Sequence, residues 1–207
     1  MSLRVVLASA SPARLATLRS AGLEPDVVVS GVDESQVTTA DPASLALELA
    51  VLKARAVATG IDDAVVIGCD SVLEFDGAVT GKPTDAGEAT ARWRAMRGRS
   101  GVLHTGHCLV DTRTGTELAR SSDTVVHFAD VSDEEIDAYV ATGEPLRVAG
   151  AFTLDGLGGA FVTGIEGDPH TVVGIGLPLL RSMFESLGVR WTDLWQADRG
   201  SLAGPTT

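Results

Sequence analysis

The sequence predicts an α/β protein with a mixed, curved sheet flanked by helices. Apolar runs and amphipathic stretches alternate early in the chain, at residues 3–8, 15–21, 42–59 and 64–69. Later, residues 102–111 and 117–128 flank a Thr-Arg-Thr-Gly turn and predict a long antiparallel hairpin. Alternation of strands and helices favours parallel pairing, whereas hairpins are antiparallel, so we expect one sheet that combines both.

The composition sets the size of the domain and the class of ligand. A chain of 207 residues fits one domain over residues 1–196, followed by a small, polar tail at 197–207 that we expect to be disordered. The hydrophobic content of 44% supports a substantial core. A formal net charge of −12 argues against binding to nucleic acids or acidic membranes.

The cysteines and apolar runs indicate the compartment. Cys69 and Cys108 form no Cys-x-x-Cys motif, and two cysteines are too few for a disulfide framework. The sequence begins without a signal-peptide pattern, and no apolar run is long enough to span a bilayer. We therefore expect a soluble, cytoplasmic, reduced protein.

The first strand, turn and helix form a candidate anion site. Ser11 is placed to cap the helix, and Pro12 occupies the first helical position. Free backbone N–H groups at this turn, the Ser9 hydroxyl and the Arg14 guanidinium suit a phosphate. The alternative is an ordinary strand–helix unit with a surface arginine.

The remaining elements follow from turn and capping signals. Asp41-Pro42 predicts the start of a helix that ends near Thr59, and Asp76-Gly77 predicts a hairpin turn. The residues from Ser132 to Glu135 match a capping box that opens a helix ending near residue 142. The other expected features are a strand at 26–30, a polar loop at 31–39, strands at 72–75 and 78–80, a helix capped by Thr84, a strand at 160–165 and a helix at 178–187.

Three charged residues have both a chemical and an ordinary interpretation. Asp70 directly follows a buried strand, where it is placed to hold a metal, act as a general base or start a turn. Lys53 shares the apolar side of its helix, so it either snorkels to solvent or faces a polar cavity. Lys82 lies between glycine and proline, and Glu34 lies in a polar loop; both have a solvated surface role as their alternative.

Several stronger signatures are absent from the sequence. It contains no P-loop, no Gly-x-Gly-x-x-Gly placed after a strand and no His-Glu-x-x-His motif. His104 and His107 are three apart in an expected strand, so they should face opposite sides of the sheet. Any phosphate chemistry must therefore use scattered lysines, arginines and carboxylates, with a divalent ion shielding charge.

An ordered series of short motifs resembles the Maf family of nucleoside triphosphate pyrophosphatases. The opening Leu-Ala-Ser-x-Ser-Pro segment is followed, in the order of that family, by matches at 33–34, 49–54, 70–71, 81–83, 105–106, 143–145, 149–152, 165–167 and 176–179. No single motif is decisive, whereas the ordered set is highly specific and spans nearly the whole chain.

The resemblance implies a fold, a reaction and a set of site residues. The implied fold has two lobes around a central cleft, as in inosine triphosphate pyrophosphatase-like proteins, and is usually dimeric. The implied reaction hydrolyses a nucleoside triphosphate between its α and β phosphates with a divalent cation, Mg²⁺ or Mn²⁺. The implied roles are triphosphate contacts for Ser9, Arg14, Lys53 and Lys82, catalysis for Asp70 and a supporting acidic group at Glu34.

Three departures from the family concern the nucleobase. Ala13 stands where the family has its first arginine, Ser71 replaces the usual threonine, and Asp155 replaces a frequent glutamine. These positions resemble those that distinguish base preference, and the loss of an arginine together with the gain of a carboxylate argues against a dTTP or UTP preference. The Asp155 carboxylate can accept from guanine N1–H and N2–H, or it starts the following glycine turn.

Two further functions compete with the pyrophosphatase. One is a nucleotide-binding regulator of cell division and septum formation with little turnover; a catalytic Asp70 beside three cations favours an enzyme over it. The other is a sugar-phosphate or dinucleotide enzyme, which predicts a glycine fingerprint that this sequence lacks.

Overall fold

A seven-stranded mixed sheet forms the centre of the molecule. The computed structural model describes residues 3–195, so the expected disordered tail lies outside the described residues. The strands are β1 Arg4–Leu7, β2 Asp26–Val27, β3 Ala64–Phe75, β4 Ala78–Thr80, β5 Ser100–Asp111, β6 Thr116–Phe128 and β7 Val162–Glu166. Their order is β2-β1-β3-β5-β6-β7, and β4 pairs with β3.

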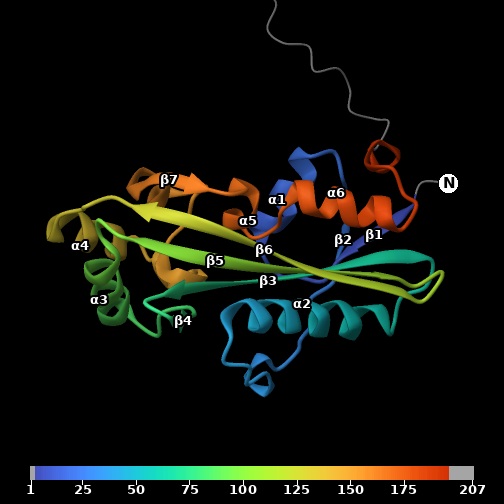
Figure 1. Cartoon of the computed structure of the whole chain (residues 1–207), viewed down its shortest axis with the longest axis horizontal. Helices are drawn as coiled ribbons and strands as arrows, with labels where there is room; N and C mark the ends of the chain where they lie inside the picture. Colours follow the sequence, from blue (N-terminus) through green and yellow to red (C-terminus); the bar gives the residue numbers. More distant parts are fainter. Residues whose placement is uncertain (1–2, 196–207) are drawn as a thin grey trace, which may run out of the picture.

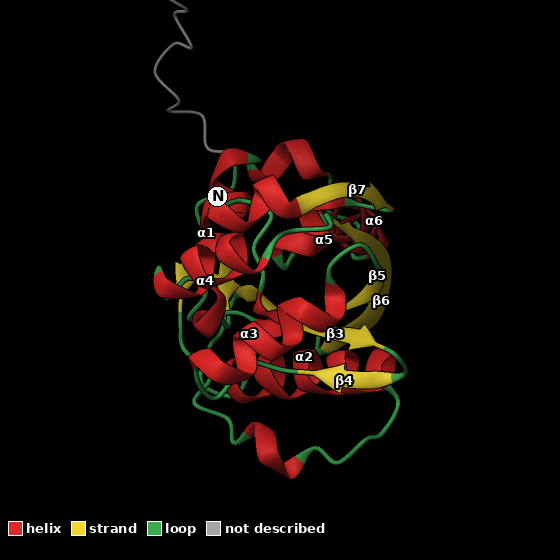
Figure 2. Cartoon of the chain, turned by 90° about the vertical axis from the view of Figure 1, so that its left-hand side faces the viewer, coloured by secondary structure: helices red, strands yellow, loops and turns green. Residues whose placement is uncertain are grey.

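The pairing confirms the predicted fold class. β1 pairs in parallel with β2 and β3, and every other pair is antiparallel. The strands β7, β6, β5 and β3 follow an arc when seen from the end of the molecule, so the sheet is curved as expected (Figure 2).

Helices cover both faces of the sheet. The α-helices are α1 Pro12–Ser20, α2 Pro42–Ala58, α3 Ala86–Met96, α4 Asp133–Ala141, α5 Pro169–Val173 and α6 Leu177–Ser186. α2 lies along one face, α1, α5 and α6 lie on the other, and α3 and α4 gather at the far end of the long strands (Figure 1). None of the described helices is both long and apolar enough to cross a membrane.

Two apolar cores divide the molecule into a near lobe and a far lobe. The near-lobe core packs Leu18 of α1 and Phe184 of α6 onto Ile67 of β3. The far-lobe core surrounds Trp93, whose ring makes edge-to-face contacts with Phe128, Tyr139 and Phe161. Because β3, β5 and β6 contribute to the far-lobe core and β3 and β5 also to the near-lobe core, the lobes share one sheet.

Two glycines allow α2 to lie unusually close to the sheet. A Cβ atom at Gly68 would lie 2.2 Å from the carbonyl oxygen of Ala50, and one at Gly106 would lie 2.3 Å from that of Ala46. No side chain fits at either position without moving the helix. This close approach fixes where the α2 side chains meet β3.

The main correction concerns β3, which does not end at Asp70. The strand runs through Asp70 to Phe75 because β5 pairs with it along this whole length, including Asp70 opposite Gly106. On its other edge, β1 pairs only as far as Ile67, and β4 begins to pair at Leu73. Asp70 therefore lies in a gap along one edge of β3, beyond the end of the parallel pairing.

Three other boundaries differ from the prediction. β2 stops at Val27 instead of 30, because β1 ends opposite it at Leu7. Asp85, not Thr84, caps α3: its carboxylate accepts from the Glu88 N–H, whereas the Thr84 hydroxyl donates to the Glu88 carboxylate. The strand expected at 160–165 begins at Val162, because residues 157–161 form a 3₁₀ turn.

Several local predictions are confirmed. Asp41 caps α2, and Ser132 and Glu135 form a capping box at α4. Asp76 and Gly77 both have positive φ angles, 52° and 74°, as a two-residue hairpin turn requires.

The two histidines of β5 face opposite sides of the sheet, as predicted. His104 lies between the carboxylates of Glu74 and Asp123. His107 is fully buried on the other face, where its Nε2 accepts from the Gly176 N–H at 2.8 Å. His107 thus joins β5 to the turn between α5 and α6.

We predict that Gly68→Ala lowers the free energy of unfolding by about 3 kcal/mol, because the new methyl group must push α2 from the sheet. Urea unfolding measures this. Gly60→Ala is the matched control, since no atom lies within 4 Å of a Cβ at that position. Equal stability of the two variants would contradict the close packing of α2.

A second prediction concerns the acid sensitivity of His107. Burial, with a smaller contribution from the Arg14 charge, lowers the pKa of His107 from 6.5 to about 4, although Asp168 opposes the shift. The unfolded chain therefore binds a proton that the folded protein excludes, and the protein loses stability as the pH falls from about 6.5 to 4.

Between pH 7 and pH 5, the wild type should lose about 2 kcal/mol more unfolding free energy than His107→Gln, whose side chain can still accept from Gly176. Urea titrations of both proteins at the two pH values measure the difference. Parallel losses in the two proteins would show that another group causes the acid sensitivity.

Candidate active site

A cleft of about 1170 Å³ lies between the two lobes, beside the unpaired edge of β3. All nine residues that the sequence singled out line it, namely Ser9, Ala13, Arg14, Glu34, Lys53, Asp70, Ser71, Lys82 and Asp155. The gap between β1 and β4 explains the position of the cleft, since side chains from both faces of β3 reach it there.

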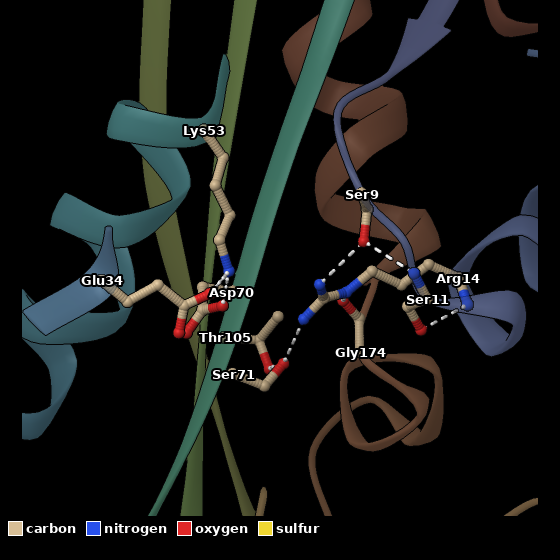
Figure 3. Close-up of polar contacts among 9 residues, drawn as sticks. All are labelled: Ser9, Ser11, Arg14, Glu34, Lys53, Asp70, Ser71, Thr105 and Gly174. Atoms are coloured by element: carbon tan, nitrogen blue, oxygen red, sulfur yellow. Dashed lines mark hydrogen bonds and ion pairs between the residues drawn. The ribbon is translucent and has the colours of Figure 1, made fainter. Parts of the chain in front are cut away.

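A buried ion pair lies at the centre of the cleft. Lys53 of α2 and Asp70 of β3 are each only 9% exposed, and Lys53 Nζ lies 2.5 Å from Asp70 Oδ1 (Figure 3). Lys53 Nζ also lies 2.7 Å from Glu34 Oε1. Lys53 therefore faces a polar cavity and does not snorkel to solvent, and Glu34 is more than a solvated loop charge.

This arrangement leaves donors and acceptors available to a ligand. An ammonium group has three N–H donors, and the two carboxylates use two of them, so one remains for a third acceptor. Lys53 engages Oδ1 of Asp70, and Oδ2 has no hydrogen-bond partner among the described residues. The pair thus offers one donor and one acceptor side by side.

Arg14 is held rigidly at the other side of β3. Its Nε donates to the Gly174 carbonyl at 2.8 Å, Nη1 to the Ser9 hydroxyl at 3.2 Å and Nη2 to the Ser71 hydroxyl at 3.4 Å (Figure 3). A guanidinium has five N–H donors, so two remain. The structure therefore brings Ser9 and Arg14 together, as the anion-site interpretation predicted.

The start of α1 adds further hydrogen-bond donors beside Arg14. Ser11 caps the helix by accepting from the Arg14 N–H, and Pro12 follows it at the first helical position, as predicted. The Ser9 oxygen accepts from both the Ser11 N–H and Arg14, so its own proton is available to a ligand. Helix N-termini and guanidinium groups both favour anions.

Two neighbouring residues of β3 contact different helices of the site. Asp70 points to α2 and Ser71 points to α1, because successive side chains in a strand alternate (Figure 3). The Ser71 hydroxyl contacts Arg14 and, at 3.1 Å, Thr105 of β5. In this structure Ser71 positions Arg14, and its expected influence on base preference stays a prediction.

The groups that support Arg14 were not predicted from the sequence. The Gly174 carbonyl lies 160 residues away along the chain, and no sequence signal marks a main-chain acceptor of this kind. His107 fixes the same turn through Gly176. Thr105 was visible only as part of a Thr-Gly motif, yet its hydroxyl links Ser71 to the Thr171 carbonyl.

Lys82 lines the cleft from the far lobe. Its main chain is anchored because Gly81 accepts from the Gly150 N–H and Pro83 is buried. Its ammonium makes no ion pair or hydrogen bond with any described residue. The structure therefore places Lys82 on the same cleft but does not bring it into contact with Lys53 or Arg14.

The positions expected to influence base preference lie on the cleft walls. Ala13 is at the start of α1, and Asp155 is exposed in the segment between Phe152 and Gly158.

The carboxylates fit a metal only together with a ligand. The described residues contain no group of three or more His, Cys, Asp or Glu side chains that could hold a metal ion. Mg²⁺ at phosphate-transfer sites is commonly held by one or two carboxylates and by the substrate phosphates. Asp70 and Glu34, joined through Lys53, match that incomplete donor set.

Comparison with known proteins identifies the family. The sequence matches the family described as "Maf-like protein" over residues 4–187. It is 60% identical to a "Nucleoside triphosphate pyrophosphatase" of Salinispora tropica, covering all of this chain and 92% of the relative. It is also 58% identical to a protein of the same name from Streptomyces coelicolor, covering 93% of this chain and 94% of the relative.

Matches to solved structures are more distant. A HAM1 protein from Coxiella burnetii aligns with a TM-score of 0.42 at 22% identity, over 62% of this chain and 74% of that one. The family is shown by the sequence matches, which cover nearly the whole chain at 58–60% identity. The chain belongs to the Maf-like protein family.

Proposed function

We propose that this protein is a nucleoside triphosphate pyrophosphatase, a hydrolase that cleaves the bond between the α and β phosphates and releases a monophosphate and pyrophosphate. The observation that carries the proposal is the buried Lys53–Asp70 pair, which lies in one cleft with the fixed guanidinium of Arg14. Relatives that are 58–60% identical over nearly the whole chain carry that name.

The cations of the cleft bind the triphosphate. Arg14 and Ser9 offer their remaining N–H and O–H donors, Lys53 offers its third N–H, and Lys82 approaches from the far lobe. Negative charge builds up on the departing pyrophosphate, and donors that are already in place stabilise it without reorganisation.

Asp70 is the catalytic carboxylate. A water molecule attacks the α phosphorus and gives its proton to Asp70, while the bond from that phosphorus to the bridging oxygen breaks and pyrophosphate leaves. Lys53 holds Oδ1, which orients Oδ2 toward the cleft. The ion pair thus keeps the base in a fixed position.

A divalent cation, Mg²⁺ or Mn²⁺, belongs to this site. Asp70 and Glu34 would hold it together with the triphosphate, and it would neutralise phosphate charge. This assignment rests on the chemistry of the two carboxylates.

The cellular role follows from the reaction. The enzyme would remove unwanted canonical or modified nucleotides in the cytoplasm; the two free, buried thiols of Cys69 and Cys108 suit a reducing compartment. A homodimer is proposed from the family resemblance alone.

We propose that Asp155 favours guanine. A carboxylate on the cleft wall accepts from guanine N1–H and N2–H, whereas pyrimidines of the dTTP and UTP type present no such pair of donors.

We predict that Asp70→Asn lowers pyrophosphate release from the preferred triphosphate by about 100-fold or more, because the amide cannot accept the proton from water. A panel of nucleoside triphosphates, assayed with and without EDTA, measures this, and release should require a divalent cation. Asp26→Asn removes an exposed carboxylate of the same sheet and should leave release unchanged. Tight nucleotide binding by the wild type without release would contradict the proposal.

For base preference, we predict that Asp155→Asn lowers kcat/KM for guanine nucleotides about tenfold, since hydrogen bonds to a charged acceptor are lost. Adenine nucleotides, assayed in parallel, serve as the internal control and should change little. A wild-type preference for dTTP and UTP over guanine nucleotides would overturn the role of Asp155.

A further inference from the structure

One carboxylate organises the far wall of the cleft. Glu144 lies between α4 and the 3₁₀ segment η2 Pro145–Arg147, and it accepts four hydrogen bonds. The Thr153 hydroxyl donates to Oε1 at 2.5 Å, the Gly158 N–H to Oε1 at 3.0 Å and the Leu157 N–H to Oε2 at 3.1 Å. The fourth donor is the Tyr139 hydroxyl, at 3.0 Å.

These bonds close a loop around Asp155. Three of the donors lie at the two ends of the segment 153–158, and Asp155 and Gly156 lie between them on the cleft wall. No helix or strand covers residues 153–156, and the 3₁₀ segment η4, Leu157–Phe161, follows them. Glu144 therefore determines the shape of the loop.

The Glu144 carboxylate and its neighbours are closely packed against the 153–158 loop. A Cβ atom at Gly156 would lie 2.7 Å from Glu144 Oε2, and one at Gly158 would lie 2.4 Å from the Tyr139 hydroxyl. Burial raises the pKa of Glu144, but the donors Thr153, Gly158 and Leu157 lower it further, so the net shift is downward. Glu144 is therefore an ionised acceptor at neutral pH.

The two ends of the cleft differ in chemistry. Arg14, Lys53 and the start of α1 make the near end suitable for a polyphosphate. The far lobe lines the cleft with the cations of Lys82 and Arg147 and, in addition, with an apolar surface and a carboxylate, contributed by Val148, Phe152, Thr153, Asp155 and Gly156. We expect a triphosphate held at the near end to place its nucleobase against this far wall.

We propose that Glu144 is the positioning residue for nucleobase selection: it holds the 153–158 loop, and with it Asp155, in the shape that distinguishes one base from another. The proposal rests on the proposed function for the identity of the ligand. Glu144 acts through the loop, so its removal should change how bases are ranked and leave the phosphate end intact.

The experiment measures binding affinity, so its result does not depend on whether the protein hydrolyses the nucleotide. Isothermal titration calorimetry gives the Kd values of α,β-methylene analogues of four nucleoside triphosphates, and of inorganic tripolyphosphate, which has no base. In Glu144→Ala, the ratio between the weakest and tightest analogue Kd should shrink about tenfold, while the tripolyphosphate Kd stays within about twofold. Glu144→Gln, which keeps one acceptor oxygen, should give a smaller change.

Two matched variants distinguish positioning from general destabilisation. Thr153→Val removes one donor to Glu144 without removing the carboxylate, and should also reduce base selectivity. Val140→Ala removes buried methyl groups from α4 in the same lobe, and should leave the selectivity unchanged.

Three results would overturn the proposal. These are a Kd ratio that is unchanged in both Glu144→Gln and Thr153→Val, a parallel loss of tripolyphosphate binding, and wild-type Kd values for all four analogues within about twofold of one another. Absence of pyrophosphate release from the wild type, in contrast, would contradict the proposed function and leave this binding test in force.

Discussion

The unpaired stretch along one edge of β3 is the constraint on which the site depends. On this edge, β1 pairs with β3 only as far as Ile67, and β4 begins to pair with it at Leu73. On the opposite edge, β5 pairs with β3 across this whole stretch. Where β3 has no neighbouring strand on this edge, side chains from both of its faces can line one cleft. For this reason Asp70 and Ser71, which point to opposite faces, contribute to one cleft.

The close approach of α2 determines the chemistry on one side of that edge. Without side chains at Gly68 and Gly106, the helix lies close enough for Lys53 to reach Asp70. Both side chains are nearly buried, so each needs the other: removing one partner of a buried ion pair typically costs about 3–5 kcal/mol. By letting α2 lie close to β3, the two glycines thus allow the ion pair that stabilises both buried charges.

Local sequence signals predicted local structure well. The caps of α1, α2 and α4 and the Asp76-Gly77 turn depend on a few adjacent residues, and all four are present. The continuation of β3 through Asp70 was mispredicted, because the pairing that sustains it comes from β5, about 35 residues later. The contact between Arg14 and the Gly174 carbonyl could not be predicted either, because the two residues are 160 positions apart in the sequence.

The cations of the cleft fall into two groups that differ in whether their side chains already have partners. Arg14 and Lys53, on the near lobe, are already fixed by hydrogen bonds and ion pairs. Lys82 and Arg147, on the far lobe, line the cleft without an ion pair or hydrogen bond from their side-chain cations to any described residue. The near-lobe donors are therefore already in place and would need no rearrangement to meet an anion. Because the chain as a whole carries a net charge of −12, a polyanion gains most where all four cations face the same cleft. A single phosphate can satisfy the near lobe, but only an extended chain of phosphates can also supply the far-lobe cations with partners.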